Sequence, residues 1–132
     1  MVQEREDKIV SLFYYKDRAI VIVQCKWNKK VIKVAPGLRD YCNGYVSVKK
    51  KWYHRWWKPD YRIIEDLFNT EELTFSGYLG DLPNLPTHLA GVWFVGFDSA
   101  HYWNIQNPES ATEKAVTKRA KKLCNEMIKK GY

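Results

Sequence analysis

The stretch RAIVIVQC, residues 18–25, decides the fold. Four of its residues are valine or isoleucine, whose branching at Cβ favours extended chain over helix. The run is apolar at consecutive positions and contains no Gly or Pro, so polar and apolar side chains do not alternate along it. Such a run is typical of a strand that is buried on both faces of a sheet.

Further strands are predicted on the C-terminal side of this run. Residues 42–48, CNGYVSV, begin with an Asn-Gly turn and then alternate. Residues 73–76, LTFS, end at Gly77, and residues 92–97, VWFVGF, are apolar on both faces. Residues 31–34 are expected to pair with the first strand as a hairpin across residues 27–30. Residues 77–91 hold three glycines and two prolines, which predicts an irregular surface loop.

Residues 49–58, KKKWYHRWWK, predict a helix rather than a strand. At 100° per residue the aromatic side chains fall on one side and the basic ones on the other, whereas a strand mixes them. Pro59 ends this helix, and Asp60 is a suitable cap for a second short helix through Phe68. The aromatic side is interpreted either as core or as a surface on which nucleic-acid bases stack.

The last segment predicts a long helix with a marked start. Residues 110–113, Ser-Ala-Thr-Glu, form a capping box after Pro108. Val116, Ala120, Leu123 and Met127 then recur on one apolar stripe, with lysines opposite. Together these patterns predict one α+β domain over residues 1–132. We expect a mainly antiparallel sheet of four or five strands, this helix packed on it, and one or two short helices within residues 50–68.

The positive charge is concentrated along the chain. The formal net charge is +7, yet residues 26–58 hold ten Lys or Arg and a single acid, Asp40. This segment predicts a basic surface that binds nucleic acid or a nucleoprotein complex. The residues expected to form it are Lys29, Lys30, Lys49, Lys50, Lys51, His54, Arg55 and Lys58. The cations of residues 114–130 are interpreted equally well as a second binding surface or as a solvated helix face.

Cysteine usage and hydropathy restrict the location of the protein. Cys25, Cys42 and Cys124 are odd in number and widely spaced, which argues against a disulfide framework and a zinc knuckle. The apolar runs are much shorter than the ~20 residues that a membrane-spanning helix needs. The charged start of the chain lacks the apolar region of a secretory signal. We therefore expect a cytoplasmic protein without contact to a membrane.

Asp98 and His101 are the candidates for a polar site, because they follow a predicted buried strand. Three residues apart, they can supply two metal ligands, but a metal centre or hydrolase needs a third from a distant place such as His54, His88 or Cys42. A structural role in the turn is the alternative. No nucleophile elbow, zinc-protease helix or phosphate-binding loop is present in the sequence. The prediction is a protein without enzymatic activity and without a cofactor.

Three motifs resemble those of a family of small uncharacterised phage and prophage proteins. They are GYVSV at residues 44–48, LTFSG at residues 73–77 and GFDSAH at residues 96–101. The family pattern places His-Gly-Gly before the second motif and Gly-Asp after the third, where this chain has Glu71-Glu72 and residues 102–104, Tyr-Trp-Asn. Of any family site built on those groups, Asp98 and His101 alone carry over.

The resemblance implies a phage setting and no particular activity. Small phage proteins without catalytic motifs often inhibit host defence or regulate host machinery. A second hypothesis is therefore a protein inhibitor of a host defence system, in the manner of anti-CRISPR proteins. It would bind its target through the partly apolar surface of residues 78–89 together with Tyr102 and Trp103.

Overall fold

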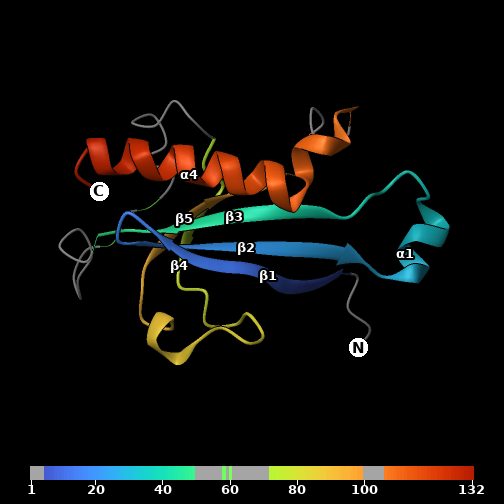
Figure 1. Ribbon diagram of the computed structural model, residues 1–132. Helices are drawn as coiled ribbons and strands as arrows, with labels where there is room; N and C mark the ends of the chain where they lie inside the picture. The colour runs from blue at the N-terminus through green and yellow to red at the C-terminus, as the bar shows by residue number, and fades with distance from the viewer. Residues whose placement is uncertain (1–4, 50–57, 59, 61–71, 100–105) are drawn as a thin grey trace.

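A five-stranded antiparallel sheet forms the centre of the protein (Figure 1). The computed structural model describes residues 5–49, 58, 60, 72–99 and 106–132. The strands are β1 (Arg5–Tyr15), β2 (Arg18–Trp27), β3 (Tyr41–Ser47), β4 (Phe75–Gly77) and β5 (Phe94–Phe97). They lie in the order β1-β2-β3-β5-β4, and every neighbouring pair is antiparallel. The predicted sheet is confirmed.

Helix α4 (Glu113–Lys129) covers one face of the sheet (Figure 1). Its predicted stripe of Val116, Ala120, Leu123 and Met127 is fully buried. These side chains pack on Ile20, Ile22, Val46, Val95 and Phe97 of the sheet. Burial of an apolar helix face contributes most of the stability of such a layer. The sheet with this helix packed on it confirms the predicted α+β fold.

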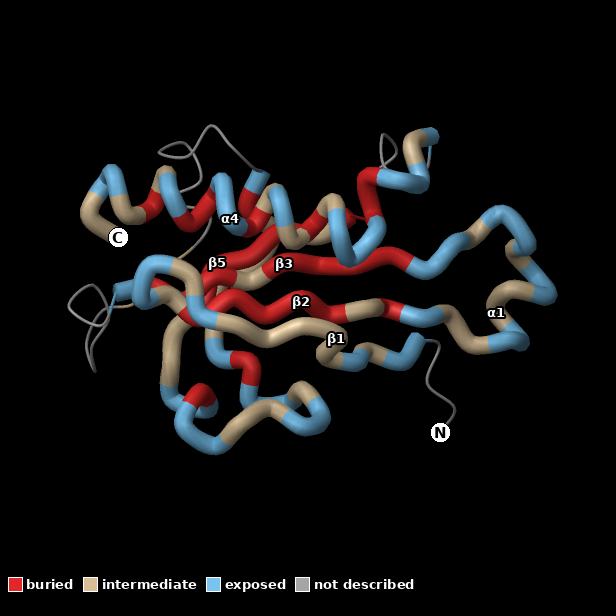
Figure 2. The backbone as a smooth tube through the Cα atoms, in the orientation of Figure 1, coloured by how far each residue is buried: buried red, intermediate tan, exposed pale blue. Residues whose placement is uncertain are grey.

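The other face of the sheet is covered by residues 78–92 instead of by a helix. This segment is irregular apart from the short η3 (Thr87–Leu89), as the sequence predicts. It is not merely a surface loop, because Leu79 and Leu89 are buried against Val21, Val23 and Phe94. Strands β2 and β3 therefore lie between two layers and are buried along most of their length (Figure 2).

Two glycine–aromatic pairs join β3 to β5. The register places Gly44 opposite Phe97 and Tyr45 opposite Gly96. A Cβ at Gly44 would lie 2.7 Å from Cζ of Phe97, and one at Gly96 would lie 2.8 Å from the Gly44 carbonyl oxygen and overlap the Tyr45 ring. Each ring therefore occupies space that only a glycine on the neighbouring strand leaves open. The Phe97 and Tyr45 rings lie on opposite faces of the sheet.

Residues 31–34 are not a strand, which corrects the predicted hairpin. They belong to α1 (Lys29–Val34). The N-cap of this helix is Asn28, whose side chain accepts a hydrogen bond from the Lys30 N–H at 2.8 Å. Both edges of β2 are already taken by β1 and β3, so a strand at this position would have no neighbour on β2. Helix α1 lies beyond the end of the sheet, where Val34 is 87% exposed.

The start of the C-terminal helix also differs from the prediction. Residues 108–111 form a separate 3-10 turn, η4 (Pro108–Ala111), in which the Ser110 hydroxyl donates to the Asn107 carbonyl at 2.6 Å. The N-cap of α4 is Thr112, whose hydroxyl accepts from the Ala115 N–H. The short helices predicted within residues 50–68 fall outside the described residues.

Candidate functional site

The exposed side of α4 carries a continuous set of lysines, here called the basic face. Helix α4 contains six basic residues and two acidic ones, Glu113 and Glu126. The members of the basic face are all exposed; they are Lys114, Lys118, Lys121, Lys122 and Lys129. Within the described parts of the chain, none of these five lysines has a carboxylate at ion-pair distance.

The turn between β1 and β2 adds a cation to the basic face. Lys16 and Asp17 have φ angles of 50° and 67°, which produces the tight two-residue connection that favours antiparallel strands. The Lys16 ammonium donates to the Asn125 side chain of α4 at 2.7 Å. Lys16 and Lys121 both lie over the Tyr15 ring, with ammonium-to-centroid distances of 5.3 and 5.6 Å. Residues about 100 positions apart in the sequence thus form one surface.

The structure separates the cations that the sequence grouped together. Lys29 and Lys30 lie in α1, before β3 begins, whereas Lys49 follows the far end of β3 (Figure 1). A seven-residue strand is about 20 Å long, so these two groups do not share a surface patch. Lys50, Lys51, His54 and Arg55 fall outside the described residues.

Lys58 is directed at two aromatic rings. Its ammonium lies 5.7 Å from the centroid of Tyr78 and 5.8 Å from that of Trp93. The two rings are perpendicular, with centroids 5.0 Å apart.

Asp98 and His101 do not form a described metal centre. Asp98 is half-buried after β5, and His101 falls outside the described residues. Among the residues that are described, no group of three or more His, Cys, Asp or Glu could hold a metal ion. Ser99 has a structural role: its N–H donates to the Asn43 side chain at 3.3 Å and its hydroxyl accepts from Arg119 at 3.1 Å.

A wide groove opens on the face of the sheet opposite α4. Its volume is about 1480 Å³, and it lies between the start of β1, the end of β2 and residues 78–83. Trp27, Tyr45, Phe75 and Tyr78 supply aromatic rings to its lining. Three cations and three carboxylates also line it, so the groove has no excess of either charge. The composition of this groove, in contrast to the basic face, does not select a polyanion.

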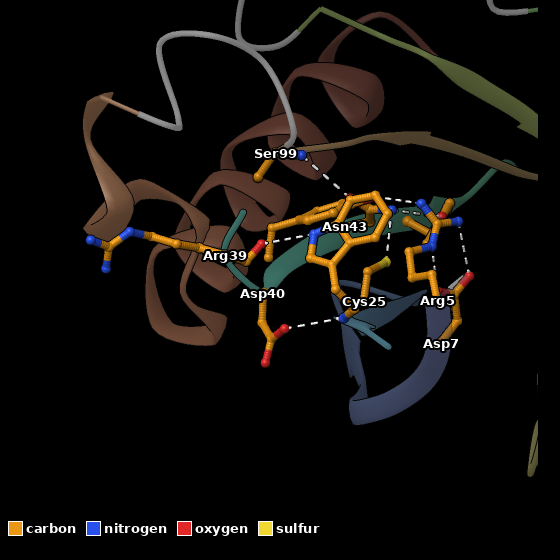
Figure 3. A network of polar contacts seen from close by, with 10 residues as sticks. Arg5, Asp7, Cys25, Arg39, Asp40, Asn43 and Ser99 are labelled. Carbon is orange, nitrogen blue, oxygen red and sulfur yellow. Dashed lines mark hydrogen bonds and ion pairs between the residues drawn. The ribbon is translucent and has the colours of Figure 1, made fainter. Parts of the chain in front are cut away.

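A polar network lies beside this groove (Figure 3). Arg5 forms an ion pair with Asp7 at 2.9 Å and donates a hydrogen bond to the Tyr41 hydroxyl. The buried Asn43 side chain donates to the Cys25 sulfur and the Tyr45 hydroxyl, both at 3.5 Å. Cys25, Cys42 and Cys124 are all free thiols and buried, in agreement with the absence of a disulfide framework.

This network predicts a loss of stability at alkaline pH. Burial raises the pKa of the Cys25 thiol and of the Tyr45 hydroxyl to about 12. In the unfolded chain these groups lose their protons at lower pH, so above about pH 9 the unfolded state binds fewer protons and stability falls. We expect the urea midpoint to decrease between about pH 9 and 12, and to decrease less in a Cys25→Ala variant. An unchanged midpoint across this range would contradict the prediction.

Comparisons with known protein families, with curated proteins and with solved structures return no match. In the described parts of the chain, no helix is both long enough and apolar enough to span a bilayer.

Proposed function

We propose that this chain is a non-enzymatic binding protein that engages nucleic acid, alone or in a nucleoprotein complex, through the basic face of α4 and Lys16. The observation that carries the proposal is the convergence of six cations from two distant segments on one exposed surface. The sequence already indicated a polyanionic partner through its net charge of +7. The geometry favours α4 as the place where this charge acts.

The arrangement of the lysines suits contacts to a phosphate backbone. Lys114, Lys118 and Lys122 follow at intervals of one helical turn, and Lys121 and Lys129 flank this row. Lysine binds phosphate as a point charge without directional demands, so this surface predicts binding that depends little on base sequence. The exposed Lys121 ammonium makes cation–π contacts with the rings of Phe13 and Tyr15.

The proposal is tested by reversing charges on the basic face. We expect a Lys118→Glu, Lys122→Glu variant to bind a labelled oligonucleotide at least ten-fold more weakly at low salt, because each reversal replaces a phosphate contact by a repulsion. Fluorescence anisotropy at several salt concentrations measures this effect, and the salt dependence should be shallower in the variant. Both positions are exposed, so thermal unfolding should change little.

Two further variants locate the interface. Lys29→Glu, Lys30→Glu changes the same amount of charge at the α1 end of the sheet and should reduce affinity much less. Lys51→Glu, Arg55→Glu tests the basic segment that the sequence favoured. If the wild-type chain binds neither single-stranded nor double-stranded oligonucleotides at low salt, or if the α4 variant binds like wild type, the proposal fails.

A second candidate function is supported by the groove. Its wall at residues 78–83 belongs to the surface that the sequence suggested for a protein inhibitor of host defence. A balanced, aromatic-lined groove favours a protein partner, whose binding would persist at high salt. A pull-down from host lysate with and without nuclease distinguishes the two functions. Recovery of one defined protein after nuclease treatment supports the inhibitor, while loss of all partners supports direct binding of nucleic acid.

A further inference from the structure

Tyr78 and Trp93 form an aromatic corner around the ammonium of Lys58. Their ring planes meet at 89° and their centroids are 5.0 Å apart. Both rings stand within 6 Å of the Lys58 ammonium, at 5.7 and 5.8 Å from the two centroids. An ammonium in such a corner is attracted by the negative faces of two rings at once, the same interaction by which aromatic cages recognise amines.

One ring of the corner is accessible from outside the protein. Tyr78 is 46% exposed, which is unusual among the large aromatic side chains that the structure describes. Tyr78 also lines the groove, so one ring of the corner borders a depression large enough for a segment of another chain. Asp81, three residues beyond Tyr78, contributes a carboxylate to that groove. Tyr78 therefore connects the cation site to a depression with room for the backbone to which a cation is attached.

We propose that the Tyr78–Trp93 corner binds a lysine side chain of a partner protein, and that Lys58 occupies the corner while the partner is absent. The chemistry of the ligand follows from the occupant, because the side chain seen between the rings is itself a lysine. Lys58 is held there by its own chain and acts as an intramolecular competitor. Its removal should increase the apparent affinity for an external ammonium without a new contact. This proposal is independent of nucleic-acid binding by α4.

The test uses Nα-acetyl-lysine methylamide as the ligand and the Trp93 indole N–H as the reporter. NMR titration of the ¹⁵N-labelled full chain follows this resonance, which is assigned by its disappearance in Trp93→Phe. We expect Lys58→Gln to bind the ligand about five-fold more tightly than wild type, the order of effect of a partly exposed cation–π contact. Lys33→Gln, the same change at an exposed lysine of α1, should bind like wild type.

Two controls connect the effect to the corner and to the charge. Tyr78→Leu in the Lys58→Gln background should abolish the shift of the Trp93 resonance, because the second ring is gone. The Nζ-acetylated ligand, which has the same shape without the positive charge, should produce no shift. A Trp93 resonance that does not move in Lys58→Gln, or equal affinities in wild type and Lys58→Gln, would overturn the proposal.

Discussion

A Gly96→Ala variant is expected to lose about 3 kcal/mol of unfolding free energy, a large part of the stability of a domain of this size. The added methyl group would lie 2.8 Å from the Gly44 carbonyl oxygen and overlap the Tyr45 ring. The Tyr45 ring packs edge-on against the Phe75 ring, with centroids 5.2 Å apart, and the Gly44 carbonyl belongs to the neighbouring strand β3. Relief of the overlap would therefore require movement of strand β3 as well as the ring.

Urea unfolding of Gly96→Ala measures this loss, and two further variants test its cause. Gly91→Ala adds the same methyl group where no atom lies within 4 Å, so its stability should stay within about 0.5 kcal/mol of wild type. Tyr45→Ala combined with Gly96→Ala removes the ring overlap but keeps the backbone contact. If Gly96→Ala unfolds at the wild-type urea midpoint, the reciprocal packing of glycine and aromatic residues is not a requirement of the sheet.

An Arg119→Met variant is expected to lose about 2 kcal/mol, because the Arg119 guanidinium joins three elements. It donates to the Ser99 hydroxyl at 3.1 Å and to the Ser110 carbonyl at 3.0 Å, and lies 4.7 Å from the centre of the Phe97 ring. Helix α4 is thereby connected to the end of β5 and to η4. Methionine retains the apolar stem but neither the donors nor the charge.

Thermal and urea unfolding of Arg119→Met are compared with Lys118→Met, which removes a neighbouring cation that faces solvent. The control should unfold like wild type. Equal unfolding of the two variants would show that the Arg119 hydrogen bonds contribute no net stability. A change in nucleic-acid affinity in Lys118→Met alone would in turn support the separate role proposed for the basic face.

The strands and the long helix could be predicted where the pattern of buried apolar residues extends along the whole element. Strand β2 is buried on both faces, so its apolar run is uninterrupted, and α4 has one buried stripe that repeats with the helical period. The segments that hold the two glycine–aromatic pairs were predicted as strands, but Asn43-Gly44 was predicted as a turn and lies inside β3. Their register, which places each ring on the opposite glycine, could not be predicted, because it is a relation between two strands that are about 50 residues apart in the sequence.

Strand β1 was missed for a local reason. Its register against β2 shifts between Ile9 and Ser11, so Val10 is an extra residue and the alternation of side chains changes phase there. At the edge of the sheet its apolar residues are also only half-buried. The error at α1 has a different origin: Val31, Ile32 and Val34 have side chains typical of a strand, but both edges of β2 are already paired with β1 and β3.

The candidate interface shows how far reasoning from sequence extends. A run of cations between residues 26 and 58 suggested one basic surface, but α1 and the end of β3 lie at opposite ends of the sheet. The Lys16 turn could not be assigned to the basic face of α4, because nothing in the local sequence relates residue 16 to residue 125. The aromatic corner around Lys58 was missed for the same reason.

The amino-acid sequence by itself determined the net charge, the apolar faces of β2 and α4, and hence an antiparallel sheet with a helix packed on it. These properties depend on composition and on periods of two and 3.6 residues, which are local. Only the tertiary structure decided which strands are neighbours, which rings lie over which glycines, and which lysines share a surface. Contacts between distant segments depend on strand order and register, and no local pattern specifies them.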